Sequence, residues 1–257
     1  MKKLISLLLV LVMAIGLMAG CAAEDSMTLE KGKLIMSTNA AFPPYEMTDD
    51  DGNYIGIDVE IAEAIAKELG LELEINNMGF TAALEAAQKG KSDMVMAGVT
   101  VNEKRLAVMD FSDTYATGIQ VVIVKEGSDV TMDNLGEKMI GTQLGTTGYI
   151  YASDTPENDG YGEDHVVGYD NGITAVQALI KGQVDCVIID NAPAQEFVKA
   201  NPGLTILEGA WVEENYAIGF EKGNTELKEA VNNALKKLIE NGTVQNIVDK
   251  YIPAEQN

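Results

Sequence analysis

The feature of this chain that most constrains its fold is an internal repeat. Residues 83–93 (ALEAAQKGKSD) align without gaps to residues 175–185 (AVQALIKGQVD), at an offset of 92 residues. Each copy joins a helical pattern to a glycine stop, and an aspartate then opens an apolar strand pattern. Helix, glycine and strand also occur together by chance, so coincidence is the alternative. The repeat predicts two α/β lobes built on one plan.

Helical and strand patterns alternate through the rest of the chain. Residues 33–38 read as a buried strand, and Asp58 is expected to cap a helix that Gly70 ends. The other expected elements are a half-exposed strand over 71–76, helices over 81–89 and 173–181, and a final helix pair over 224–241 and 243–251. Such alternation is typical of α/β proteins.

The ends of the two repeated strands indicate where a ligand would bind, because open α/β sheets bind ligands beyond their strand ends. Gly98 stands five residues after Asp93, and Asp190 stands five residues after Asp185. If the two lobes face each other, Gly98 and Asp190 meet across one cleft.

The N-terminus has the pattern of a signal peptide. Lys2 and Lys3 precede an uncharged run over 4–19, and Cys21 follows Gly20 directly. This junction resembles the lipobox of bacterial lipoproteins. The alternative is a transmembrane anchor, but about 16 apolar residues fall short of the roughly 20 that span a bilayer.

Removal of the signal peptide, residues 1–20, would leave Cys21 as a lipidated N-terminus that carries palmitate-type acyl chains. Residues 21–32 are then expected to form a tether, because they are acidic and have little apolar content. The expected location is the extracytoplasmic face of the cell membrane, with the lipid anchor as the only membrane contact.

The composition argues against several classes of partner. Without Lys2 and Lys3, 40 acidic residues stand against 16 basic ones, and a formal charge of −24 repels nucleic acid and anionic lipid headgroups. The single histidine excludes a histidine-based metal cluster, and neither metal nor cofactor is expected. With Cys21 lipidated, Cys186 lacks a disulfide partner, and its apolar surroundings predict a core position rather than a nucleophile.

Five segments of the chain resemble motifs of the family 3 bacterial solute-binding proteins. They are residues 39–46 (NAAFPPYE), 56–61 (GIDVEI), 97–100 (AGVT) with Arg105, 145–147 (GTT) and 185–190 (DCVIID). The similarity extends over residues 33–252.

This resemblance implies an α/β, periplasmic-binding-protein-like fold of type II, in which a two-segment hinge joins two α/β lobes and the ligand cleft lies between them. Lobe 1 would comprise residues 33–116 and 217–257, and the inserted lobe 2 residues 117–216. A monomer is expected that captures a free amino acid and presents it to the permease and ATPase of an ABC importer.

A free amino acid carries a carboxylate and an ammonium, and both need partners when water leaves the cleft. Arg105 is the candidate for the carboxylate because its guanidinium offers two parallel donors, although an arginine in such a turn is more often solvated. Thr146 and Thr147 follow Gly145 at the start of an expected helix, where unpaired N–H groups favour the same anion.

The ammonium is expected to bind Asp190, together with the carbonyl of Gly98 and the hydroxyl of Thr100. The alternative is that Asp190 caps the helix that begins near Asn191, and both roles are compatible.

The matched motifs indicate which residues surround the ligand's side chain. Phe42 and Phe80 are expected to sandwich it, although buried aromatic residues are often simply core. Asn39 and Gln143 lie where the family reads the side chain. Two amides favour a polar ligand, whereas Ile189 adds an apolar neighbour and leaves the identity of the amino acid open.

The leading interpretation is binding without catalysis, because no nucleophile–base pair is visible and lobe closure is sufficient for capture. An amino-acid sensing module is the first alternative. The second is a secreted enzyme similar to the cyclohexadienyl dehydratases, in which Asp190 would be the general acid.

Overall fold

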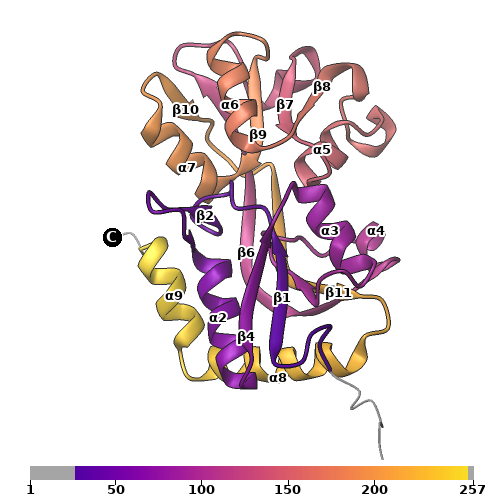
Figure 1. The fold of residues 1–257 in the computed structure, drawn as a ribbon. Coiled ribbons are helices and arrows are strands. Elements are labelled where there is room, and N and C mark those ends of the chain that lie inside the picture. Colours follow the sequence, from indigo (N-terminus) through magenta and orange to yellow (C-terminus); the bar gives the residue numbers. More distant parts are fainter. Residues whose placement is uncertain (1–26, 254–257) are drawn as a thin grey trace, which may run out of the picture.

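The computed structural model of the protein describes residues 27–253. The predicted signal peptide, residues 1–20, and Cys21 lie outside this range. Figure 1 shows two lobes, one above the other, through which a single mixed sheet of nine strands continues. The strand order is β4 (Glu72–Asn77), β1 (Lys33–Thr38), β5 (Met94–Val95), β11 (Val212–Glu221), β6 (Met109–Lys125), β9 (Cys186–Asp190), β7 (Ile140–Gln143) and β8 (Val166–Tyr169), with β10 (Leu204–Ile206) beside β6. A separate hairpin joins β2 (Met47–Thr48) and β3 (Tyr54–Ile55).

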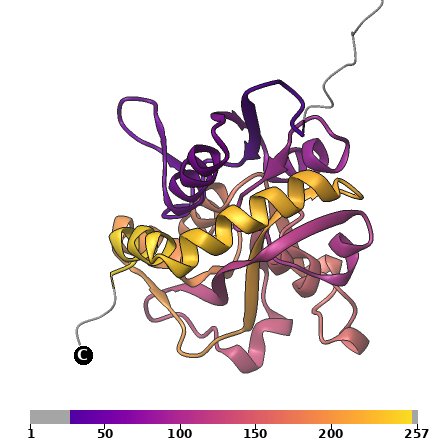
Figure 2. The same ribbon diagram turned by 90° about the horizontal axis from the view of Figure 1, so that it is seen from below.

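The lower lobe in Figure 1 is a three-layer α/β structure. Strands β1 (Lys33–Thr38), β4 (Glu72–Asn77) and β5 (Met94–Val95) are parallel and are covered by α2 (Ile57–Leu69), α3 (Phe80–Gln88), α8 (Thr225–Glu240) and α9 (Thr243–Tyr251). Successive strand residues face opposite sides. Accordingly, Met94 packs in a core with α2 and α8, whereas Val95 packs in a second core with α3. Seen from below, α8 crosses the base of the molecule (Figure 2).

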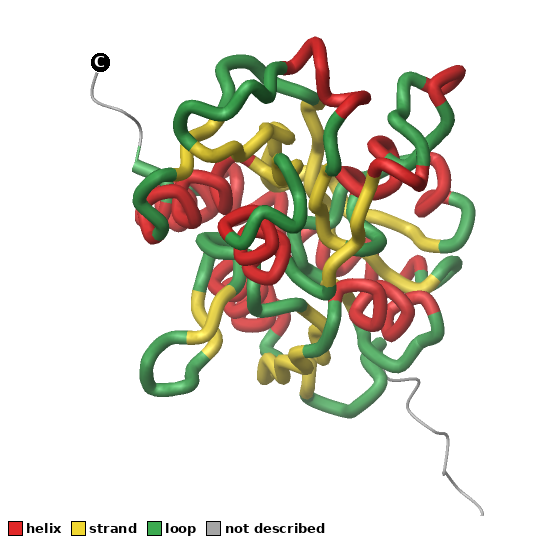
Figure 3. The backbone as a smooth tube through the Cα atoms, turned by 90° about the horizontal axis from the view of Figure 1, so that it is seen from above, coloured by secondary structure: helices red, strands yellow, loops and turns green. Residues whose placement is uncertain are grey.

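The upper lobe repeats this plan. Strands β7 (Ile140–Gln143), β8 (Val166–Tyr169) and β9 (Cys186–Asp190) are parallel, and β10 (Leu204–Ile206) joins the sheet through β6. The helices are α5 (Thr147–Ala152), α6 (Gly172–Ile180) and α7 (Asn191–Ala200), with 3₁₀ turns over Met132–Glu137, Pro156–Asn158 and Glu163–His165. Figure 3 shows from above how helices lie around the strands.

The internal repeat of the sequence is a repeat of the structure. β1 pairs with β5 through Met36 and Met94, and β7 pairs with β9 through Ile140 and Cys186, which stands 92 residues after Met94. The aspartate that opens each repeated strand makes the same kind of contact. Asp93 accepts a hydrogen bond from the N–H of Ile35 at 2.7 Å, and Asp185 accepts one from the N–H of Met139 at 2.8 Å.

Two long antiparallel strands connect the lobes. β6 (Met109–Lys125) and β11 (Val212–Glu221) each run from one lobe into the other, and their pairing is irregular on both sides of Ala217. The predicted lobe boundaries fall in these strands, where Ala116 pairs with Tyr216. A short α4 (Glu103–Leu106) precedes β6.

Two sequence-based expectations need correction. Asp58 does not cap α2, which begins at Ile57 after Gly56; Asp58 is fully buried and accepts hydrogen bonds from the N–H of Gly98 (2.9 Å) and the hydroxyl of Tyr115 (2.7 Å). A side chain at Gly56 would overlap the carbonyl of Tyr45, so the chain can enter the helix there only at glycine.

The second correction concerns the tether expected over residues 21–32. Within the described residues, this segment belongs to the folded body. Thr28 is buried, and the N–H of Leu29 donates to Asp93 at 2.7 Å. Cys186 is completely buried in the upper lobe, as predicted. Over residues 27–253, no helix is long and apolar enough to cross a bilayer.

Candidate functional site

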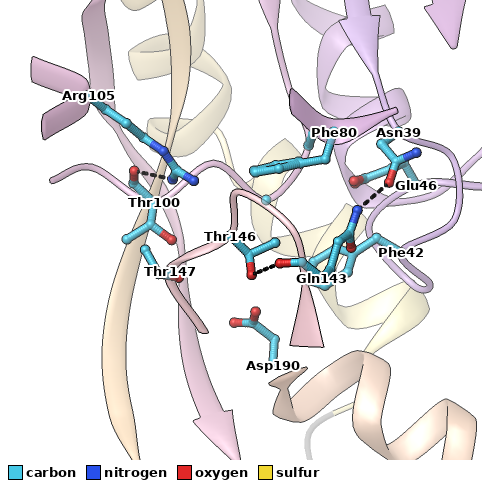
Figure 4. Close-up of a pocket in the computed structure, with 12 residues that line it drawn as sticks. Asn39, Phe42, Glu46, Phe80, Thr100, Arg105, Gln143, Thr146, Thr147 and Asp190 are labelled. Carbon is cyan, nitrogen blue, oxygen red and sulfur yellow. Dashed lines mark hydrogen bonds between the residues drawn. The ribbon is translucent and has the colours of Figure 1, made fainter. Parts of the chain in front are cut away.

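All ten residues that the sequence predicted for ligand binding line one pocket between the lobes (Figure 4). The free space between these side chains is about 20 Å³, which is room for roughly one water molecule. The lining residues are Asn39, Phe42, Phe80, Gly98, Thr100, Arg105, Gln143, Thr146, Thr147 and Asp190, with Glu46 and Ala97 in addition. The structure thus brings together residues from both lobes that are up to 151 positions apart in sequence.

Strand ends supply four of these residues. Asn39 directly follows β1, and Gly98 comes three residues after β5. In the upper lobe Gln143 ends β7 and Asp190 ends β9. The repeated architecture explains this placement, because the carboxyl ends of parallel strands lie at the same edge of a sheet.

Arg105 connects the two lobes at one side of the pocket. It lies on α4, where the side chain of Asn102 accepts a hydrogen bond from its N–H. Its guanidinium donates from Nη1 to the carbonyl of Thr100 (2.7 Å) and from Nη2 to the carbonyl of Gly145 (3.1 Å). It also lies 5.4 Å from the centroid of the Phe80 ring. Burial lowers the pKa of Arg105 to about 10, so it remains charged at neutral pH.

The first turn of α5 faces Arg105 from the upper lobe (Figure 4). Thr146 is the N-cap: its hydroxyl accepts from the N–H of Tyr149 and donates to the carbonyl of Gln143 at 2.8 Å. Thr147 is buried beside it. A guanidinium and the start of a helix therefore approach the same part of the pocket, and both favour an anion.

Asp190 is a buried carboxylate on the other side of the pocket. It stands at the N-cap position of α7, but its side chain makes no capping hydrogen bond. Instead it accepts from Gln120 Nε2 at 2.7 Å and from the hydroxyl of Tyr216. Burial is the main cause that raises the pKa of Asp190 to about 8, and the nearby Glu214 raises it further.

Sequence reasoning missed Gln120, Glu214 and Tyr216, which surround Asp190 from the two connecting strands. Glu214 is 4% exposed and accepts from Thr100 Oγ1 at 2.9 Å and from Gln120 Nε2 at 3.1 Å. A glutamate and a glutamine in strands read as solvent-facing residues, so only their neighbours in space identify them.

Glu46 was also missed as a lining residue, although it belongs to one of the matched motifs. It is fully buried, and neither of its carboxyl oxygens has a hydrogen-bond partner among the described residues. Burial and the neighbouring Asp58 raise the pKa of Glu46 well above its ordinary value. Burial also raises the pKa of Asp58 to about 6.

The two predicted aromatic residues each have a neighbour on one side. The Phe42 ring stacks on Tyr45 with centroids 5.6 Å apart, and Phe80 faces the guanidinium of Arg105. Gly98 has a positive φ of 54°, and a Cβ there would lie 2.8 Å from the Phe42 ring. The close approach of Phe42 to the backbone thus requires glycine.

Comparisons with known proteins agree with this architecture. Residues 34–254 match the sequence model of the bacterial extracellular solute-binding proteins, family 3. The chain is similar to the L-cystine-binding protein TcyJ of Escherichia coli K12, with 30% identity over 255 residues that cover 95% of this chain and 94% of TcyJ. It is 31% identical over 262 residues to the arginine-binding extracellular protein ArtP of Bacillus subtilis, with 100% of both chains covered.

A solved structure has the same fold. The arginine-, lysine-, histidine-binding protein ArtJ from Geobacillus stearothermophilus matches with a TM-score of 0.80 and 35% identity, covering 88% of this chain and 97% of ArtJ. The two-lobed fold of type II predicted from the sequence motifs is thereby confirmed.

The buried carboxyl groups predict how stability depends on pH. Asp190, Asp58 and Glu46 have pKa values raised in the folded protein, so between about pH 4 and 8 the folded state holds more protons than the unfolded state. Stability of the ligand-free protein should therefore fall as pH rises through this interval. Groups with lowered pKa values, such as Asp110, act only below about pH 4.

The Asp190→Asn variant isolates the contribution of Asp190 to this pH dependence of stability. Between pH 6 and 8 the free energy of unfolding of the wild type should fall by about 1 to 3 kcal/mol more than that of this variant, which corresponds to a few degrees of melting temperature. Thermal unfolding at pH 5, 6, 7 and 8 measures both slopes. Parallel curves for the two proteins would contradict the raised pKa of Asp190.

Proposed function

We propose, on the premise that the chain belongs to the bacterial extracellular solute-binding proteins of family 3, that it is the extracytoplasmic substrate-binding component of an amino-acid ABC importer. It captures a free polar amino acid between its lobes. The observation that carries this proposal is the pair of buried ionisable side chains, the guanidinium of Arg105 and the carboxyl of Asp190, which line one pocket. Such a pair complements the carboxylate and ammonium that every free amino acid carries.

In this proposal, Arg105 binds the ligand's carboxylate with the help of Thr146 and Thr147. Its contacts with the carbonyls of Thr100 and Gly145 hold the guanidinium in place. Because it is buried, its attraction for an anion is weakly screened by water. The anion in turn offsets the cost of burying the guanidinium.

Asp190 binds the ammonium, together with the carbonyl of Gly98 and the hydroxyl of Thr100. The Thr100 hydroxyl donates its hydrogen to Glu214, so its lone pairs remain for the ammonium. The N–H of Gly98 donates to Asp58 at 2.9 Å, which holds the backbone next to this carbonyl. The ligand's ammonium would favour the ionised form of Asp190, whose pKa burial and the nearby Glu214 raise in the ligand-free protein.

Lobe closure is proposed to occur about β6 and β11, with lobe 1 formed by residues 33–116 and 217–257 and lobe 2 by residues 117–216. The irregular pairing around Ala217 supports a hinge there, because a break in a ladder leaves the strands easier to bend. The closed form presents both lobes together to the permease and ATPase complex. The relatives and the solved structure above are binding proteins rather than enzymes.

We also propose that Cys21 is lipidated after removal of residues 1–20 and that the protein is an extracytoplasmic, membrane-anchored monomer. Gly20-Cys21 after an uncharged run supports this proposal. Two acyl chains on one residue give stable anchoring, where a single chain is marginal.

The first test replaces Arg105 with alanine. The loss of two charge-assisted hydrogen bonds to a buried carboxylate should cost roughly 3 to 5 kcal/mol, or about two to four decades in affinity. Arg105→Lys should recover only part of the lost affinity, because a lysine ammonium cannot make the two parallel hydrogen bonds of the planar guanidinium. Calorimetric titration gives the affinities, and circular dichroism checks the fold. Unchanged affinity in a folded alanine variant would remove Arg105 from the site.

The second test is a thermal-shift screen of the mature protein, unfolded and refolded to remove bound ligand, against the twenty amino acids, cystine and ornithine. A ligand at about 100 times its Kd adds roughly 2.7 kcal/mol of stability, which is at least roughly 5 °C for a chain of this size. Polar amino acids should give the largest shifts. If native, refolded protein responds to none of them, the proposed function is wrong.

The third test addresses the anchor. Cys21→Ser should release the protein into the soluble fraction or block its processing, whereas the wild type stays with the membrane. Fractionation of cells that express each form measures this directly. Retention of the serine variant in the membrane fraction would indicate another kind of attachment.

A further inference from the structure

We propose that Asn39 and Gln143 select an amino acid with an uncharged carboxamide side chain, such as glutamine, over one with a cationic side chain. This inference rests on the proposed function, because it concerns the part of the same pocket that lies beyond the groups assigned to the ligand's carboxylate and ammonium.

The two amides form a hydrogen-bonded pair across the cleft. Gln143 Nε2, from the upper lobe, donates to Asn39 Oδ1, from the lower lobe, at 2.9 Å (Figure 4). Each amide is also anchored in its own lobe. Asn39 Nδ2 donates to the carbonyl of Met78 at 2.9 Å, and Gln143 Nε2 donates to the carbonyl of Asp170 at 3.3 Å.

These anchors determine which way each amide points. A backbone carbonyl can only accept, so the nitrogen of Asn39 must face Met78 and the nitrogen of Gln143 must face Asp170. Both N–H groups of Gln143 are then in use. Its Oε1 accepts no hydrogen bond from the described residues, although the side chain lines the pocket, and Asn39 Nδ2 keeps a second N–H.

The amide pair therefore leaves one free acceptor and one free donor. A carboxamide can use both, because its NH₂ donates and its oxygen accepts. A guanidinium or ammonium has donors only, and a carboxylate has acceptors only, so each would leave one amide group unpaired. An unpaired polar group in a water-excluded pocket weakens binding.

Charge favours the same choice. Asn39 and Gln143 are neutral. Burial and the neighbouring Asp58 raise the pKa of Glu46, the carboxyl that lines this part of the pocket, and so disfavour its charged form. The other acidic residue beside the pair, Asp170, is exposed, and water screens it. A cationic side chain would thus be buried beside two neutral amides, which is costly.

The test compares ligands on the wild type and on a charge variant. In calorimetric titrations the wild type should bind glutamine at least tenfold more tightly than arginine, lysine or glutamate. Asn39→Asp keeps the shape and the acceptor for Gln143 but supplies a negative charge. It should shift the ratio of glutamine to arginine affinity towards arginine by at least tenfold.

Asn241→Asp is the matched control. It makes the same chemical change at an exposed turn between α8 and α9, where the side chain only accepts from the N–H of Thr243. Its glutamine-to-arginine ratio should equal that of the wild type. Because a ratio of two affinities is compared, a general weakening of binding in Asn39→Asp does not imitate the effect.

The outcomes separate this inference from the proposed function. If the wild type binds arginine or lysine more tightly than glutamine, the carboxamide preference is wrong and amino-acid binding stands. If Asn39→Asp changes the ratio no more than Asn241→Asp does, the amides do not select the side chain. If native, refolded protein binds no amino acid, the proposed function fails and this inference with it.

Discussion

The antiparallel pairing of β6 with β11 is the interaction on which the rest of the architecture depends. It is the only strand pairing through which the sheet of the lower lobe continues into that of the upper lobe within residues 27–253. The pairing fixes the distance between the lobes and leaves a break beside Ala217. It also brings Gln120 and Tyr216 against Asp190 and Glu214 against Thr100, two residues that line the pocket. The hinge and part of the site are therefore the same piece of structure.

This arrangement concentrates buried charge at one place. Arg105, Asp190 and Glu214 are all less than 10% exposed, and taking a charge out of water costs several kcal/mol unless it is paired. Hydrogen bonds from Gln120, Tyr216 and Thr100 offset part of this cost. In our proposal a zwitterionic ligand offsets more, because its carboxylate pairs with Arg105 and its ammonium favours the ionised form of Asp190. Because burial raises the pKa of Asp190, the stability of the ligand-free protein depends on pH.

Two α/β lobes of the same plan also explain why the cleft is polar on both sides. In the lower lobe, Asn39 follows β1 and Gly98 lies beyond the end of β5. In the upper lobe, Gln143 ends β7 and Asp190 ends β9. Equivalent positions meet across the cleft and have diverged in chemistry. The pair Asn39–Gln143 remains alike and reads the side chain in our proposal, whereas Gly98 and Asp190 differ and share the ammonium.

The sequence by itself determined the repeat and most of the helices, because helix periods and glycine stops are local features. Ten of the twelve residues that line the pocket were named chiefly from the resemblance to the family motifs, with strand-end positions supporting Gly98 and Asp190. Tertiary structure decided the rest. Gln120 and Asp190 are 70 residues apart and Thr100 and Glu214 are 114 apart, so no local pattern distinguishes these buried polar groups from solvent-facing ones. The same reason explains Asp58, which reads as a helix cap in sequence and instead binds the N–H of Gly98. Burial is a property of the folded chain, and with it come the raised pKa values and the free Oε1 of Gln143.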